Sequence, residues 1–197
     1  MGRSNINNKA VFLDRDGVIN KNIYYKDSNE WESPRKTSDF YLLDGVVESL
    51  QELQENNYLL FIVTNQPSYA KGKTSLKSLQ EIIELTDKTM KNNNINIIKT
   101  YCSFKHKDSI YKEFLTPCEY RKPKIGSLVD AKENYKIILE NSWMIGDRDT
   151  DIECGLKAKT KTIKINNKQE KNNKYAFYNV KNLQEAKNKI LAYSGKY

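Results

Sequence analysis

Two clusters of carboxylates follow short apolar segments of this chain. Asp14-Arg15-Asp16 comes directly after residues 10–13, and Asp147-Arg148-Asp149-Thr150-Asp151 comes after residues 143–146. Carboxylates that lie together repel one another and raise each other's pKa values. A divalent cation that prefers oxygen ligands relieves this repulsion, and Mg²⁺ is the usual choice. Any single pair is equally consistent with helix caps or turns, so the metal interpretation depends on both clusters reaching one place.

The elements around these acids predict how they would meet. Apolar runs at residues 10–13, 58–63, 95–101, 143–146 and 162–165 predict buried strands. Helical spacing predicts helices that begin after Asp44, after Thr74 or Ser75, near residue 125, after Asp147 and near residue 182. Alternation of this kind predicts an α/β, Rossmann-like three-layer sandwich with a central parallel sheet, one domain over residues 1–197 with its core at about 9–193. Ligands of such sheets bind beyond the carboxyl ends of the strands, where Asp14, Thr64 and Asp147 stand.

Composition excludes several classes of protein. No apolar run approaches the roughly 20 residues that cross a bilayer, and residues 1–9 lack the apolar segment of a secretory signal. Three cysteines without close pairing argue against a disulfide framework and for a reducing cytoplasm. The net charge is +8, concentrated in residues 151–197, where 11 lysines stand against 4 acids. Lysine rises together with asparagine along the chain, so we interpret the excess as solvated surface and do not expect a nucleic-acid partner.

The acidic clusters belong to a larger pattern. Asp14-Arg15-Asp16-Gly17-Val18 resembles the first motif of the haloacid dehalogenase superfamily of phosphatases. Thr64, Lys122 before Pro123, and residues 146–151 are similar to its second, third and fourth motifs, in the same order. Residues 12–20, 64–66, 70–73 and 121–123, with Cys102 and Cys118, most resemble the subfamily of heptose-1,7-bisphosphate 7-phosphatases and their histidinol-phosphatase relatives. The resemblance covers about residues 10–165.

This resemblance implies a mechanism. Asp14 would be the nucleophile that forms an aspartyl-phosphate, and Asp16 the general acid and base, with a pKa raised by nearby carboxylates and burial. Mg²⁺ would be held by the Asp14 side chain, the Asp16 carbonyl and Asp147, while Asp151 supports these ligands from behind.

The resemblance also assigns the substrate contacts. Thr64, Asn65, Gln66 and Lys122 would bind the phosphoryl group, and Arg121, Arg148 and Tyr25 match positions that contact substrate. A guanidinium suits a second phosphate. Tyr24 and Trp31 either stack on a sugar or pack their own loop. Pro67 lacks the N–H of the residue usual at its position, which affects substrate identity rather than catalysis.

The intervals between the motifs leave no room for an inserted cap domain, so we expect residues 20–41 and 102–121 to cover the site as loops. In the second of these loops the subfamily has four zinc donors. Here Cys102, Cys118 and His106 supply three, with Phe104 and Tyr120 at the other positions. A structural zinc site needs four, so we expect burial of Phe104 and Tyr120 to hold the loop in place of zinc; a zinc ion bound by Cys102, His106 and Cys118 is the alternative. We expect Cys154 to be a small core residue.

The sequence thus predicts a Mg²⁺-dependent phosphatase of the cytoplasm, a monomer that hydrolyses the 7-phosphate of heptose 1,7-bisphosphate in bacterial surface-sugar synthesis, for lipopolysaccharide or capsule. Two alternatives stay open. The substrate is another ester, histidinol phosphate or a polynucleotide 3′-phosphate, or the chain is a binding module that kept the fold and lost catalysis.

Overall fold

The sheet predicted from the apolar runs is present and parallel throughout. The computed structural model describes residues 8–166 and 172–194, and its main sheet has six strands in the order β5-β4-β1-β6-β7-β8. These strands are β1 (Lys9–Leu13), β4 (Tyr58–Asn65), β5 (Ile97–Ser103), β6 (Trp143–Gly146), β7 (Lys161–Ile165) and β8 (Tyr178–Val180). All four residues of β6 and the last four of β1 are buried, as expected of central strands with helices on both faces.

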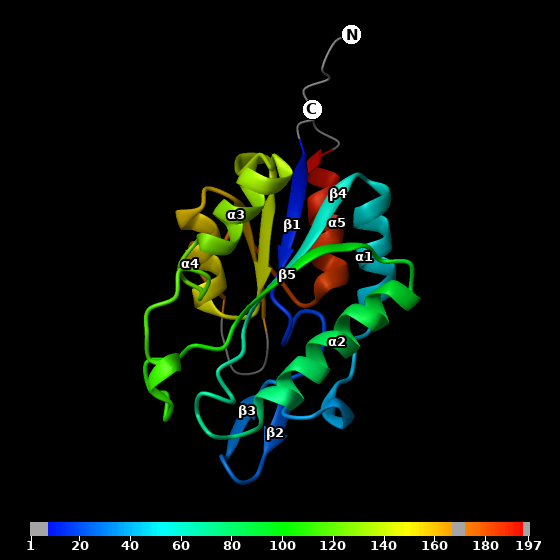
Figure 1. The fold of residues 1–197 in the computed structure, drawn as a ribbon. Coiled ribbons are helices and arrows are strands. Elements are labelled where there is room, and N and C mark those ends of the chain that lie inside the picture. The colour runs from blue at the N-terminus through cyan, green and yellow to red at the C-terminus, as the bar shows by residue number, and fades with distance from the viewer. Residues whose placement is uncertain (1–7, 167–171, 195–197) are drawn as a thin grey trace.

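Helices cover both faces of this sheet. They are α1 (Val46–Glu55), α2 (Leu76–Asn92), α3 (Gly126–Tyr135), α4 (Asp149–Lys157) and α5 (Leu183–Ser194). Figure 1 shows α3 and α4 on one side and α1 and α5 on the other. The apolar core is divided accordingly, with Leu50 and Ile190 in one cluster and Leu128 and Cys154 in the other. The expectation of a three-layer α/β sandwich is therefore confirmed, and Cys154 is a core residue as predicted.

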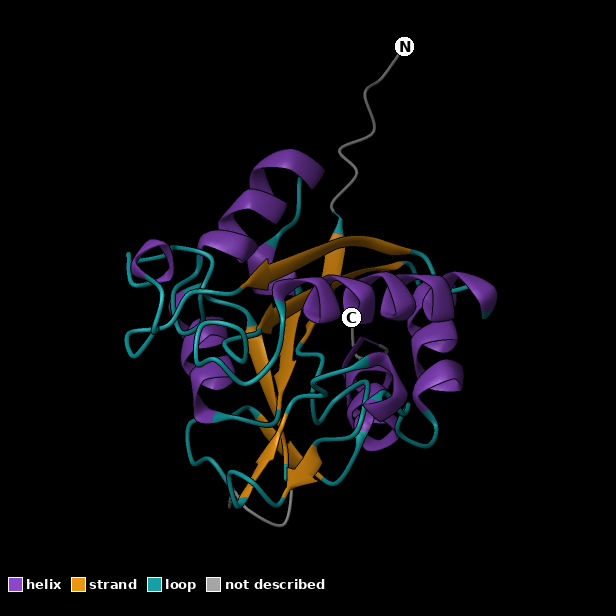
Figure 2. Cartoon of the chain, turned by 60° about the horizontal axis from the view of Figure 1, so that its bottom comes forward, coloured by secondary structure: helices purple, strands orange, loops and turns teal. Residues whose placement is uncertain are grey.

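Short elements occupy the segments between these layers. An antiparallel hairpin of β2 (Ile23–Tyr25) and β3 (Glu30–Glu32) follows β1, and 3-10 turns lie at Thr37–Asp39, Lys112–Phe114 and Leu139–Asn141. Figure 2, which turns the lower end of Figure 1 forward, shows the hairpin and the loops gathered at the carboxyl ends of the strands. None of the described helices combines the length and the apolar character that crossing a bilayer requires.

The structure also decides several local expectations. Asp44 does not cap α1, because Gly45 takes the N-cap position in a left-handed conformation and no side chain bonds there. Ser75, one of the two residues proposed for α2, does cap it by accepting a hydrogen bond from the backbone N–H of Ser78. Strand β8 and the hairpin were not expected. The predicted loop at 166–174 lies partly outside the described residues, at 167–171.

Candidate active site

Three carboxylates, two at strand ends and one in the first turn of a helix, meet at the carboxyl edge of the sheet. Asp14 follows β1 and Asp147 follows β6; these strands are paired, and the Asp14 N–H donates to the Ile145 carbonyl oxygen at 2.9 Å. Asp151 lies in the first turn of α4. One carboxylate oxygen of each acid lies within 4.8 Å of the others, and all three residues are buried. Both sequence clusters therefore reach one place.

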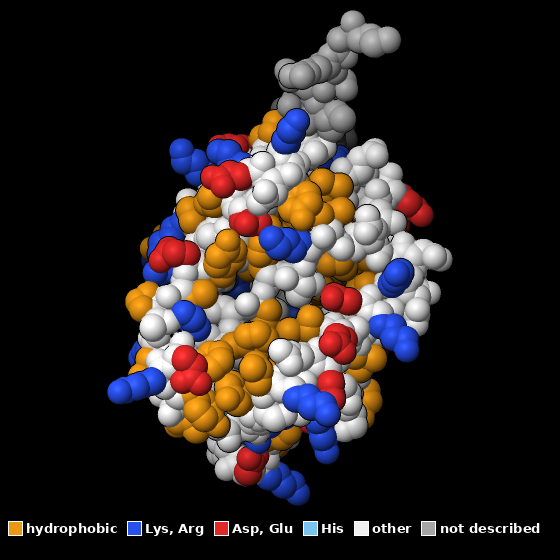
Figure 3. All heavy atoms as spheres, viewed as in Figure 1, with side chains coloured by type: hydrophobic (Ala, Val, Ile, Leu, Met, Phe, Trp, Pro, Cys, Tyr) orange, Lys and Arg blue, Asp and Glu red, His pale blue; other side chains and the backbone are white. Residues whose placement is uncertain are grey.

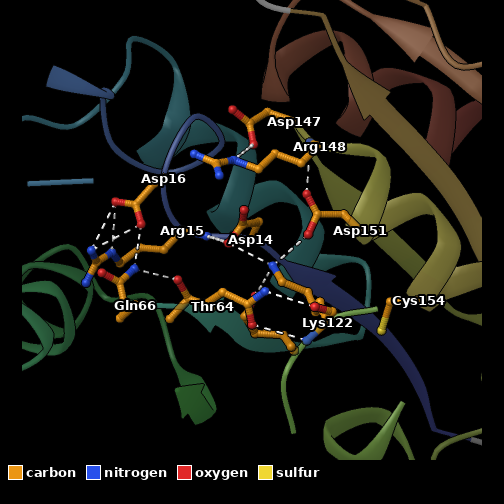
Figure 4. A network of polar contacts seen from close by, with 12 residues as sticks. Asp14, Arg15, Asp16, Thr64, Gln66, Lys122, Asp147, Arg148, Asp151 and Cys154 are labelled. Carbon is orange, nitrogen blue, oxygen red and sulfur yellow. Dashed lines mark hydrogen bonds and ion pairs between the residues drawn. The ribbon is translucent and has the colours of Figure 1, made fainter. Parts of the chain in front are cut away.

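A buried lysine balances part of this charge. The Lys122 ammonium lies 2.9 Å from Asp14 Oδ1 and 2.7 Å from Asp151 Oδ1, and it donates to the Val63 carbonyl oxygen at 2.5 Å (Figure 4). The Asn65 side chain fixes the lysine backbone, since its Oδ1 accepts from the Lys122 N–H and its Nδ2 donates to the Lys122 carbonyl, each at 3.1 Å. Lys122 is thus held against the acids by a residue 57 positions away.

The acids perturb one another strongly. Burial, reinforced by the charges of Asp151 and Asp16, raises the pKa of Asp14 to about 6 although Lys122 opposes the change. Burial and the charges of Asp14 and Asp151 raise the pKa of Asp147 to about 7. The paired carboxylates in turn raise the pKa of Lys122, against the effect of its burial. The site therefore carries more negative charge than one ammonium neutralises.

This donor set fits a divalent cation. Three ionised carboxylates outnumber the two cations beside them, the Lys122 ammonium and the Arg148 guanidinium, whose Nε lies 4.0 Å from Asp147 Oδ1. Hard oxygen ligands are those that Mg²⁺ prefers. The backbone approaches the acids closely: a Cβ on Gly17 would lie 2.2 Å from Asp147 Oδ2, and one on Gly146 would lie 2.1 Å from Asp151 Oδ2. Within residues 8–166 and 172–194, this is the only group of three or more potential ligands from His, Cys, Asp and Glu within such reach. Asp151 also accepts from the Arg148 N–H at 3.0 Å.

The side chain of Asp16 lies apart from this group, and its pKa differs from the prediction. Figure 4 shows it turned toward Arg15 and Gln66. Its carboxylate accepts from Arg15 Nη2 at 3.0 Å, Asn20 Nδ2 at 2.9 Å and Gln66 Nε2 at 2.5 Å. Burial alone would raise the pKa of Asp16, but the Arg15 charge and these hydrogen bonds outweigh it, so the pKa lies below its ordinary value rather than above it.

A cavity of about 390 Å³ opens beside the acids. Asp14, Asp16, Asn65 and Lys122 line it, as do Arg121 and Arg148, which the motifs placed at substrate contacts. The hairpin and the loop after β4 supply lining residues that the motifs did not single out as contacts, namely Glu30, Glu32, Ser33, Ser68, Lys71 and Lys73. Of these residues, the sequence singled out only Lys71 and Lys73, which lie in the segment 70–73 that resembles the subfamily.

Three residues predicted to contact substrate do not line this cavity. Thr64 and Gln66 are buried and are not among the residues that line the cavity. The Tyr25 hydroxyl donates to Asp39 Oδ2 at 2.5 Å and accepts from the Arg35 N–H at 2.8 Å, so it holds its own loop. The structure therefore does not bring Tyr25 to the site.

The hairpin fixes the positions of Tyr24 and Trp31, the two aromatic residues expected either to stack on a sugar or to pack their own loop. Trp31 lines the cavity and is half exposed, while Tyr24 packs against it with ring centroids 5.6 Å apart. Trp31 is therefore available as a wall for a ligand, and Tyr24 supports it.

The three possible zinc donors are not gathered into one set. Cys118 Sγ accepts from Ser103 Oγ at 3.5 Å, and His106 Nδ1 accepts from the Asp108 N–H at 3.1 Å. Ring stacking holds the loop instead, between Tyr69 and Tyr111 at 4.6 Å and between Tyr101 and Tyr120 at 6.1 Å. Tyr120 is 41% exposed, so it acts by stacking and not by the burial we expected. Figure 3 shows hydrophobic side chains gathered over this part of the molecule.

Sequence comparisons point to one group of enzymes. Residues 13–180 match the family described as polynucleotide kinase 3 phosphatase. The chain is 35% identical over 183 residues to a D-glycero-alpha-D-manno-heptose-1,7-bisphosphate 7-phosphatase of Campylobacter jejuni, covering 91% of this chain and 94% of the relative. It is 33% identical over 154 residues to a D-glycero-beta-D-manno-heptose-1,7-bisphosphate 7-phosphatase of Haemophilus influenzae, covering 78% of this chain and 79% of the relative.

Solved structures share the fold. A HAD-like phosphatase from Mesorhizobium loti superposes with a TM-score of 0.78 at 19% identity, covering 98% of this chain and 88% of that one. A D,D-heptose 1,7-bisphosphate phosphatase from B. bronchiseptica, complexed with magnesium and phosphate, gives a TM-score of 0.75 at 18% identity, covering 94% of this chain and 99% of that one.

Proposed function

Because the chain belongs to the haloacid dehalogenase-like phosphatases, in the family that includes the heptose-1,7-bisphosphate 7-phosphatases, we propose that it hydrolyses the 7-phosphate of D-glycero-D-manno-heptose 1,7-bisphosphate. The observation that carries this proposal is the buried group of Asp14, Asp147, Asp151 and Lys122 in a chain 35% identical to such an enzyme over 91% of its length. The reaction would serve bacterial nucleotide-heptose synthesis for lipopolysaccharide or capsule.

The proposed chemistry divides a hard hydrolysis into two steps. The Asp14 carboxylate attacks phosphorus, and the ester oxygen leaves with a proton from Asp16. Without substrate the charge of Arg15 and hydrogen bonds lower the pKa of Asp16, so this step requires that the negative charge of the bound phosphate raise that pKa and let Asp16 take up a proton. Water then hydrolyses the aspartyl-phosphate with Asp16 as base. Lys122, 2.9 Å from Asp14, would offset the charge that develops on the phosphoryl oxygens. Mg²⁺, held by the side chains of Asp14 and Asp147 and the carbonyl of Asp16, would neutralise the phosphoryl group and the acids.

The cavity offers a place for a second phosphate. Burial lowers the pKa of Arg121, and the nearby Arg148 charge lowers it further, so two guanidinium groups lie close enough to repel. Arg121 Nη1 is buried without a hydrogen-bond partner among the described residues. An anion between these guanidinium groups would relieve both costs, as a bisphosphate substrate requires.

A polynucleotide 3′-phosphate is the second candidate, because the matching family is described as polynucleotide kinase 3 phosphatase. Against it, basic and acidic side chains are interspersed on the face seen in Figure 3, where a nucleic-acid site would favour a continuous basic stripe. We further propose that the chain works in the cytoplasm as a monomer of one catalytic domain.

Phosphate release from a panel of esters tests the proposal. The panel holds both anomers of heptose 1,7-bisphosphate, histidinol phosphate and a 3′-phosphorylated oligonucleotide, each with Mg²⁺ and with EDTA. We expect turnover of a heptose bisphosphate and none by Asp14→Asn, which removes the nucleophile. Activity confined to the oligonucleotide or to histidinol phosphate would refute the substrate assignment. No activity on any ester would favour a binding module, and turnover by Asp14→Asn would refute the mechanism.

A further inference from the structure

Gln66 lies beneath the cavity rather than in its wall. Its side chain is fully buried, directly after β4, and its backbone N–H donates to the Ser103 carbonyl oxygen at 2.7 Å. The adjoining residues Asn65 and Pro67 line the cavity, whereas Gln66 does not. A direct contact between this amide and a phosphoryl group is therefore not what the fold provides.

The amide instead connects Asp16, the proposed general acid, to Thr64, which the motifs placed at the phosphoryl group. Gln66 Nε2 donates to Asp16 Oδ2 at 2.5 Å and to Thr64 Oγ1 at 2.7 Å. An NH₂ group has two hydrogens, so both are used. Since Thr64 Oγ1 accepts from the amide, its own hydroxyl hydrogen stays available for donation.

The orientation of the amide is fixed by these contacts. Gln66 Oε1 is buried and has no hydrogen-bond partner among the described residues. Rotating the amide by half a turn would set this oxygen against the Asp16 carboxylate, which is more costly than leaving it unpaired. The amide orientation therefore satisfies acceptors on Asp16 and Thr64 and leaves the Gln66 side-chain carbonyl without a hydrogen bond.

From this geometry we propose that Gln66 is a positioning residue for the general acid Asp16. Arg15 and Asn20 hold one side of the Asp16 carboxylate, through contacts to Oδ1 at 3.0 and 2.9 Å. Gln66 donates to the other oxygen, Oδ2, at 2.5 Å, closer than Arg15 Nη2 at 3.2 Å, and links this oxygen to the end of β4. The carboxyl thereby keeps its place in the cavity wall, where it must meet the leaving oxygen. This proposal rests on the phosphatase activity proposed above.

The leaving group separates this role from a contact to phosphate. A sugar alkoxide needs a proton to depart, whereas 4-nitrophenolate departs without one, so only the first depends on a well-placed acid. The quotient kcat/KM reports the steps up to departure of the leaving group and excludes later hydrolysis of the aspartyl-phosphate. A lost phosphate contact would lower kcat/KM for both kinds of ester alike.

The test compares Gln66→Met with the unmodified protein, because methionine keeps the length and volume of the side chain and removes both donors. We expect kcat/KM for heptose 1,7-bisphosphate to fall about 10- to 100-fold while kcat/KM for 4-nitrophenyl phosphate changes less than about threefold. Asn65→Ala is the matched control: its side chain fixes the Lys122 backbone, so we expect both esters to lose by the same factor.

Equal losses on both esters in Gln66→Met, or no loss on either, would overturn the proposal. Retained hydrolysis of 4-nitrophenyl phosphate shows that the variant is folded; should Gln66→Met not fold, Gln66→Ala is compared in the same way. If the unmodified protein hydrolyses a different ester of the panel, the substrate assignment fails alone. Histidinol phosphate and a polynucleotide 3′-phosphate also leave as alkoxides, so the comparison with 4-nitrophenyl phosphate still tests Gln66.

Discussion

Replacing Asp147 by asparagine should stabilise the metal-free protein while it removes the metal site. Asp147 is 1% exposed, and burial together with the charges of Asp14 and Asp151 raises its pKa to about 7 from an ordinary 3.8. Each tenfold change in an acid constant is about 1.4 kcal/mol. At pH 8 the ionised carboxylate therefore costs the folded state about 4 kcal/mol relative to the unfolded chain. Because an asparagine keeps part of the burial cost, we expect a gain of about 2–4 kcal/mol.

The sign of this effect depends on pH in a defined way. A carboxyl whose pKa is raised in the folded state favours folding below its unfolded value, and the benefit is lost as the pH rises toward 7. The advantage of Asp147→Asn should therefore be small near pH 4, grow through pH 5 to 7, and be complete by about pH 8. With Mg²⁺ the order should reverse, because the cation stabilises the unmodified protein and not the variant.

Urea unfolding in EDTA across this pH range measures the effect. Asp149→Asn is a suitable control, since Asp149 is exposed and hydrogen bonds from Asn173 and Lys164 lower its pKa. Its replacement should give no gain at high pH. A variant Asp147→Asn that is no more stable than the unmodified protein at pH 8 would refute the reasoning, as would a difference that does not change with pH.

Three further outcomes are expected. Lys122→Met should lose activity and about 3–5 kcal/mol of folding free energy, measured by urea unfolding, because Asp14 and Asp151 lose their buried partner; a loss below 1 kcal/mol would contradict this. Gly146→Ala should weaken Mg²⁺ binding in calorimetry, since its Cβ would lie 2.1 Å from Asp151 Oδ2, and unchanged affinity would show that the loop relaxes freely. Mg²⁺ affinity should rise from pH 5 to 8, as Asp14 and Asp147, with pKa values of about 6 and 7, lose their protons; an affinity that falls with pH would contradict it.

Much of the scaffold follows from local patterns. Continuous apolar runs such as residues 58–63 mark strands that are buried on both faces, and the structure has β4 there. Parallel strands end at the same edge of a sheet, so Asp14 and Asp147 had to meet once both runs were recognised as strands. The sequence did not predict the short strands, because three residues are too few to show a hydrophobic period. These strands are β8 and the hairpin strands β2 and β3.

The charge states within the site depend on contacts that no local pattern contains. The sequence places Asp16 beside Asp14 and suggests a raised pKa. In the fold, the charge of the adjacent Arg15, which is buried with its guanidinium against Asp16, lowers that pKa, and a hydrogen bond from Gln66, 50 residues away, lowers it further. The Tyr25 hydroxyl donates a hydrogen bond to Asp39 within its own loop, so its side chain does not line the cavity.

The sequence by itself therefore determined which residues carry the chemistry and at which edge of the sheet they lie. The position at the sheet edge follows because apolar side chains that become buried recur along the chain in patterns that identify the strands. Only the tertiary structure decided which of those groups are ionised and which way they face. Electrostatic and hydrogen-bond energies depend on distances of a few ångströms between residues far apart in sequence, such as Lys122 against Asp14, and these distances exist only after folding.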